Sequence, residues 1–145
     1  MATGKANVFT NDFLKLIFQA TAIPNVADNA ASSPLTNLYL SLHTADPGAS
    51  GDQTTNEVSY TSYARVAVAR SSSGFSISGE TVTLFANASF PAGTGGSGTA
   101  TYVGVGTASS GTGILLYRCT LTPNVVCGSG VTPIVNSGGT GIVES

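Results

Sequence analysis

The segment Asn37–His43 constrains the fold more than any other part of the chain. Leu38, Leu40 and Leu42 occupy alternate positions in it. Successive side chains of an extended chain point to opposite faces, so the three leucines share one face. Asp46-Pro47-Gly48 ends the segment, because proline fixes φ and has no N–H while glycine accepts a positive φ. The pattern predicts the first core strand of a β-sandwich, with one face buried.

Short apolar segments separated by turn residues follow along the rest of the chain. Turn signals at intervals of about 8–12 residues are typical of antiparallel sandwiches and jelly rolls. We therefore predict an all-β fold, an antiparallel β-sandwich of jelly-roll type over residues 37–145, with one short N-terminal helix. The segment 114–121 is the most apolar, and we expect it at the centre of a sheet. The further strands are expected near residues 63–71, 75–77, 82–84, 101–107, 114–121, 131–135 and 142–143.

The first 36 residues differ in composition from the sandwich. Residues 1–8 are small and polar, which predicts a flexible N-terminal arm, and residues 9–36 predict a helix and a linker. Asn11 and Asp12 can cap the start of the helix. Such a short helix is marginal in water, so it must pack over the sandwich or its open end, or dock partly on another subunit. Its apolar face consists of residues at helical spacing, Phe13, Leu14, Ile17 and Phe18.

Charge and hydropathy exclude several classes of protein. Only 8% of the 145 residues are charged, the net charge is −2, and the five basic residues are scattered. Nucleic acid binding needs a clustered basic surface, so we expect no nucleic acid partner. No apolar run approaches the roughly 20 residues of a membrane span, and we expect neither membrane insertion nor a secretory signal. A surface with so few charges suits a subunit packed in an assembly.

Residues that could carry chemistry do not form a recognisable motif. His43 lies near Asp46 and several serines, but a nucleophile elbow is absent, and we expect a hydrogen-bonded surface histidine. The loop acids Asp46, Asp52 and Glu57 do not match a calcium-binding loop, and we expect them to be solvated. The glycine-rich segment 93–98 lacks the lysine of a phosphate-binding loop. We therefore predict no enzyme activity and no catalytic, cofactor-binding or metal-binding residues.

Two further features concern packing. Cys119 and Cys127 enclose seven residues, and either a disulfide or two free thiols fits this spacing. In the segment 101–107, valines alternate with Gly104 and Gly106. The glycine face lets another backbone or a bulky side chain approach closely.

Five segments, together with the apolar helix, form a pattern in which order and spacing extend over nearly the whole chain. They are Leu38–Gly48, Thr55–Val58, Tyr63–Val68, Phe90-Pro91 and Val103–Thr107. This pattern resembles the capsid cement (decoration) proteins of tailed bacteriophages, a family with relatives labelled as tail-fibre-like virion proteins.

The resemblance implies a jelly-roll protein on the outer surface of the virion capsid, where it binds the major capsid protein and copies of itself, as a dimer or trimer. Candidate contacts lie in the arm, on the helix face, in the polar loop 49–57 and at two strand arginines, for which solvation at a strand edge is the alternative. These capsid or oligomer contact residues are Lys5, Val8, Phe13, Ile17, Phe18, Asp52, Glu57, Arg65 and Arg70.

Three functions are therefore considered. The first is a capsid cement protein that stabilises an HK97-like head. The second is a tail or tail-fibre component with a structural or receptor-binding role. The third is a carbohydrate-binding or unrelated β module, for which the tyrosines, without any tryptophan, are weak support.

Overall fold

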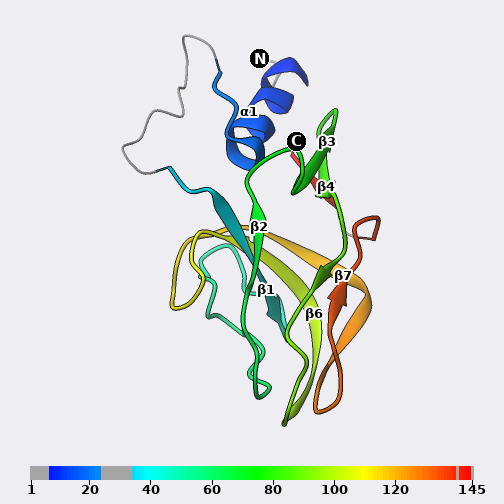
Figure 1. Ribbon diagram of the computed structural model, residues 1–145. Coiled ribbons are helices and arrows are strands. Elements are labelled where there is room, and N and C mark those ends of the chain that lie inside the picture. The colour runs from blue at the N-terminus through cyan, green and yellow to red at the C-terminus, as the bar shows by residue number, and fades with distance from the viewer. Residues whose placement is uncertain (1–6, 24–33, 140, 145) are drawn as a thin grey trace.

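The computed structural model describes residues 7–23, 34–139 and 141–144 (Figure 1). The expected arm up to residue 6 and most of the expected linker, residues 24–33, lie outside the described residues. The elements are α1 (Asn7–Gln19), β1 (Asn37–His43), β2 (Val66–Ala69), β3 (Phe75–Ser78), β4 (Thr81–Leu84), β5 (Ala88–Ser89), β6 (Ser97–Gly106), β7 (Leu115–Gly128), β8 (Ile134–Val135) and β9 (Gly141–Val143).

The main layer is a four-stranded antiparallel sheet in the order β2-β1-β6-β7. β1 lies inside this sheet, where Leu40 is the register partner of Val66 on β2 and of Val105 on β6. Leu38, Leu40 and Leu42 are at most 2% exposed, so the predicted buried face is confirmed.

The prediction that segment 114–121 is central is wrong. β7 lies at one edge of the main sheet and β2 at the other, and β1 and β6 are the inner strands. Leu115, Leu116 and Tyr117 are only half-buried, and Ile114 is 64% exposed. The apolar side chains of β7 cover the rim of the sheet rather than its middle, a distinction that hydrophobicity alone does not make.

Two smaller sheets complete the sandwich, one in the order β3-β4-β9 and one that pairs β5 with β8. Both are antiparallel, and Phe75, Val82 and Val135 from these sheets are at most 2% exposed. They join the leucines of β1 in one hydrophobic core. The all-β sandwich with one helix is therefore confirmed, while its jelly-roll type stays a prediction.

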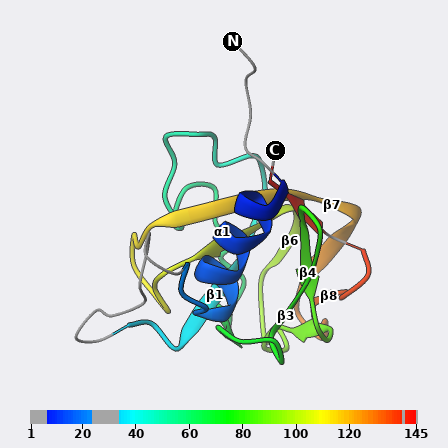
Figure 2. The ribbon, with the colours of Figure 1, turned by 90° about the horizontal axis from the view of Figure 1, so that it is seen from above.

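The helix α1 closes the end of the sandwich between the layers, as the view from above shows (Figure 2). The ring of Phe18 lies 4.9 Å from that of Phe75 on β3 and 5.5 Å from that of Tyr117 on β7. Phe18 and Leu14 are both 0% exposed. The helix thus packs on its own chain and links the two layers.

The ends of α1 differ from the expectation. The helix begins at Asn7, so Asn11 does not cap it, and the amide of Asn11 instead donates to the carbonyl of Gly79 at 2.9 Å. At the other end, the guanidinium of Arg70 donates to the carbonyls of Leu16 and Ile17. The last turn of a helix leaves carbonyls without a donor from a following turn, and Arg70 supplies donors at this end of α1.

Both cysteines are free thiols. Cys119 and Cys127 lie eight positions apart on β7, roughly 25 Å along an extended strand, whereas a disulfide needs Cα atoms within about 7 Å. Burial raises the pKa of both thiols, that of Cys119 to about 11. Among the described residues, the single helix, α1, is too short to cross a membrane.

Candidate functional site

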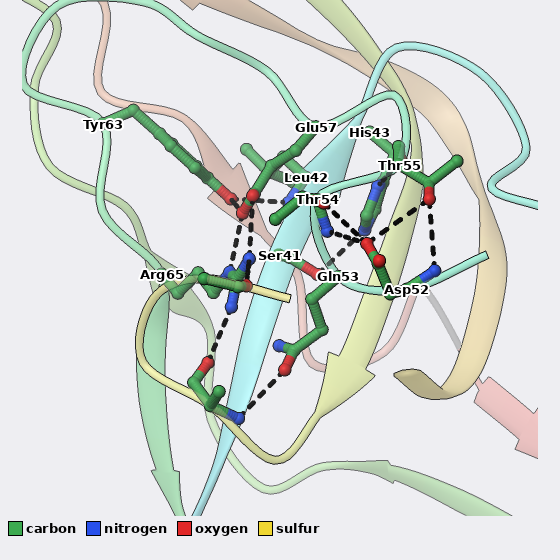
Figure 3. Close-up of polar contacts among 12 residues, drawn as sticks. Ser41, Leu42, His43, Asp52, Gln53, Thr54, Thr55, Glu57, Tyr63 and Arg65 are labelled. Atoms are coloured by element: carbon green, nitrogen blue, oxygen red, sulfur yellow. Dashed lines mark hydrogen bonds and ion pairs between the residues drawn. The ribbon is translucent and has the colours of Figure 1, made fainter. Parts of the chain in front are cut away.

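The C-terminal half of the second face of β1 is also buried, and it is polar. Ser41 and His43 are both 0% exposed. The expectation of a surface histidine is therefore wrong, because loop 49–57 folds back over this face of the strand. Figure 3 shows the side chains that converge there. We call this group the polar clasp, which consists of Ser41, His43, Gln53, Thr55, Glu57, Tyr63 and Arg65.

His43 connects β1 to the loop. Its Nδ1 lies 2.8 Å from the carbonyl oxygen of Thr55, and its Nε2 lies 2.8 Å from Oγ of Ser41. A carbonyl only accepts hydrogen bonds, so Nδ1 carries the proton and Nε2 accepts from the Ser41 hydroxyl. Desolvation by burial is the main effect, and it lowers the pKa of His43. The clasp therefore holds a neutral imidazole of one defined tautomer.

Gly104 and Gly106 on β6 make room for the clasp. A Cβ on Gly104 would lie 2.7 Å from Nε2 of His43, and one on Gly106 would lie 2.1 Å from Cδ of Gln53. These separations are shorter than real Cβ contacts allow. The prediction of a close approach at the two glycines is confirmed, and the approaching groups are side chains.

A bidentate ion pair forms the second part of the clasp. Nε of Arg65 lies 2.7 Å from Oε1 of Glu57, and Nη2 lies 2.8 Å from Oε2. The two side chains are 3% and 15% exposed. The Tyr63 hydroxyl donates to Oε1 of Glu57 at 2.8 Å and accepts from the backbone N–H of Leu42 at 3.1 Å. Burial raises the pKa of Tyr63, and the hydrogen bonds to Glu57 raise that of Arg65.

The remaining N–H groups of Arg65 reach a second loop, 107–114. They donate to the carbonyls of Ala108 at 2.9 Å and Gly111 at 2.7 Å. Arg65 thus links loop 49–57, through Glu57, to loop 107–114, through the carbonyls of Ala108 and Gly111.

Gln53 is the least predictable member of the clasp. It is 0% exposed, its N–H donates to the carbonyl of Thr112, and its Oε1 accepts from the N–H of Ala108 at 2.9 Å. Its Nε2 has no hydrogen-bond partner among the described residues. A buried unpaired donor lowers the free energy of unfolding by about 1–3 kcal/mol, so this atom of Gln53 is an unfavourable feature of the clasp.

The clasp is arranged for structure rather than for chemistry. Ser41 and His43 have the contact of a nucleophile and its base, but Nδ1 of His43 faces a backbone carbonyl instead of the carboxylate of a triad. Both residues are inaccessible to a substrate in this conformation. In the described part of the chain, no group of three or more His, Cys, Asp or Glu side chains is placed to hold a metal ion.

The predicted contact residues fall into separate places. Val8 on α1 is 75% exposed, Phe13 and Ile17 are half-buried, and Phe18 belongs to the core of its own chain. Arg70 binds the end of α1, as described above, and Lys5 lies outside the described residues.

The other predicted contacts meet at the loop. Glu57 and Arg65 form the ion pair of the clasp, and Asp52 is half-buried beside it. Oδ1 of Asp52 accepts from the N–H of Thr54 at 2.8 Å and from its hydroxyl at 2.6 Å. These contacts order the loop from within.

Sequence reasoning missed Ser41, Gln53 and Tyr63. The glycines at 104 and 106 were the available signal that bulky groups approach, but they do not indicate which groups. No local sequence pattern predicts that a glutamine in a polar loop will be buried.

The model of a protein family described as "Podophage GP4 fiber I protein gp80" matches residues 7–142. No curated protein matches the chain.

Proposed function

The chain belongs to the podophage GP4 fiber I protein gp80 family, and it is a phage virion protein. We propose that it is a fibre-type structural subunit that acts by binding, without catalysis. The observation that carries this proposal is the family match, which covers residues 7–142, almost the entire chain. The family description names a fibre, so it favours the tail-fibre function over the capsid cement function that the sequence had placed first.

The geometry of the clasp supports a binding role. Loop 49–57 is ordered by Asp52 from within and held to the sheet by Glu57, Arg65 and His43. An ordered loop loses little conformational entropy when a partner binds it. We propose that the outward side of this loop and the exposed side of α1 contact other virion subunits, including copies of this chain.

Capsid cement is the second candidate, and one observation favours it. The segments Leu38–Gly48 and Tyr63–Val68 resemble phage cement proteins in residue type and spacing. In that case the major capsid protein is the partner, and binding to the assembled shell stabilises the shell by mass action.

Immunogold labelling of purified virions tests both candidates. Antibodies raised against the isolated protein are expected to label the tail, and quantitative mass spectrometry should find few copies per particle. Label over the whole head, at a fixed ratio to the shell protein, would overturn the fibre proposal in favour of cement. Absence from purified virions would overturn both.

A glycan-binding screen with the isolated protein tests whether it recognises a carbohydrate receptor. Specific binding would add receptor recognition to a protein that labels the tail, and it would favour a carbohydrate-binding module if the protein is absent from virions.

A further inference from the structure

His43 is the single histidine of the chain, and it is completely buried between β1 and loop 49–57. We propose that His43 is an acid-operated latch: when its imidazole takes up a proton, loop 49–57 separates from β1 while the rest of the sandwich stays folded. The proposal does not depend on whether the protein acts in a fibre or on a capsid.

A second proton on the ring would reverse the hydrogen bond at Nε2 in the closed geometry. Nδ1–H already donates to the carbonyl of Thr55, and Nε2 accepts from the hydroxyl of Ser41. A proton on Nε2 would turn this acceptor into a donor and force the Ser41 hydroxyl to find another partner. The space beside Nε2 is limited, because a Cβ on Gly104 would lie 2.7 Å from Nε2 and from Cδ1 of Leu115. Water therefore has little room to solvate the charged ring.

Two charged groups, Glu57 and Arg65, act on the charge of the ring, and they act in opposite directions. From the loop, Glu57 would attract an imidazolium, but both of its oxygens bind Arg65, and Oε1 also binds Tyr63 (Figure 3). Arg65 itself repels a second cation. Oδ1 of Asp52, also in the loop, is taken by Thr54.

Beyond the loop, the segment after β1 presents a carboxylate that is paired, and β6 presents a tyrosine. Asp46, which follows β1, pairs with Arg118 on β7 at 2.7 Å. The register partner of His43 on β6 is Tyr102, which brings no carboxylate to the ring. Desolvation therefore dominates the balance of charges around the ring and holds the pKa of His43 below 6.5 in the closed state.

The direction in which the stability of the closed loop changes with pH follows from the difference in the pKa of His43 between the closed and open states. When the loop is open, the imidazole on β1 is exposed to water and has its ordinary pKa near 6.5, so the open state binds more protons than the closed state. Above pH 6.5 the closed state has its full stability. Below pH 6.5 the ratio of open to closed loop rises by up to about tenfold per pH unit, until the pKa of the closed state is reached.

The loop is the part that responds because its own carbonyl, that of Thr55, binds the ring. Two further backbone bonds attach the same loop to β1, from Thr44 N to Asn56 O and from Val58 N to Leu42 O. The leucines of β1 lie on the opposite face of the strand, within the core. Their packing does not depend on the charge of His43.

Amide hydrogen exchange between pH 7.5 and 5.0, corrected for the intrinsic exchange rate, tests the latch. The amides of Thr44 and Val58 should show a constant opening equilibrium above pH 6.5 and a rise of up to about tenfold per pH unit below it. Amides of the β1–β6 ladder, such as that of Val105, should not follow. An opening equilibrium that is independent of pH, or an equal rise in the ladder, would overturn the proposal.

The variant His43→Gln is the matched control, because a carboxamide can donate and accept but does not titrate in this range. It should remove the rise below pH 6.5, and a rise that persists would assign the effect to the carboxylates and overturn the latch. If this variant does not fold, NMR of the single histidine in the wild type decides. A ring that becomes protonated near pH 6.5 while the loop stays closed would overturn the proposal.

Discussion

At the C-terminal end of β1 both faces of the strand are buried, but by opposite means. On one face, Leu38, Leu40 and Leu42 enter a hydrocarbon core, and on the other, Ser41 and His43 enter the polar clasp. Hydrocarbon packing is non-directional, so any side chain of suitable volume contributes. In the clasp each polar atom needs a specific partner, and two glycines must leave space. The comparison teaches that equal burial does not mean equal tolerance of substitution.

The largest expected effect lies in the polar face. Arg65→Ala leaves the Glu57 carboxylate buried without its cation, and we expect a loss of about 3–5 kcal/mol in the free energy of unfolding, measured by chemical denaturation. The matched control is Arg118→Ala, which breaks the exposed pair with Asp46 and should leave the free energy of unfolding nearly unchanged.

A double variant sharpens this test. Replacing Arg65 and Glu57 together by methionine removes both charges, so it should recover most of the stability lost by Arg65→Ala. An equal loss of unfolding free energy in the single and double variants would mean that the unpaired charge of Glu57 does not explain the loss in Arg65→Ala.

On the apolar face, Leu40→Ala should lower the free energy of unfolding by about 2–5 kcal/mol, through lost burial and the cavity that remains. Denaturation of Val126→Ala on β7 provides the control, because Val126 is 59% exposed and little should change. A small loss of unfolding free energy for Leu40→Ala would show that the core of the sandwich repacks easily. It would contradict the predicted contribution of the apolar face to stability.

The smallest expected effect is that of Gly104→Ala, at about 1–3 kcal/mol, because its methyl group would meet His43, Ser41 and Leu115 at 2.7 Å. The loss should appear as a lower midpoint of denaturation. Gly98→Ala on the same strand is the control, since nothing lies within 4 Å of a Cβ there. Similar losses for both variants would mean that strand propensity, rather than the clasp, explains the effect.

The local patterns predicted several parts of the fold. The alternation of apolar residues predicted β1 and its buried face. The apolar pairs Phe75 and Ile77, and Val82 and Leu84, predicted the strands β3 and β4. The glycine face of β6 predicted a close approach of other groups. These features depend on neighbours within a few residues, which a linear pattern records. The position of β7 at the edge and the start of α1 at Asn7 depend on distant partners, and both predictions failed.

The sequence alone determined that this chain forms an antiparallel β-sandwich with a helix docked by its apolar face, because strand and helix periodicity set which side chains can share a face. Only the tertiary structure decided that His43 is buried and that Gln53, Glu57 and Arg65 meet beside it. Their contacts span up to 55 positions, as between Gln53 and Ala108, and no local pattern encodes a partner at that separation. The physical reason is that a polar group is stable in the interior only where distant backbone and side-chain atoms complete its hydrogen bonds.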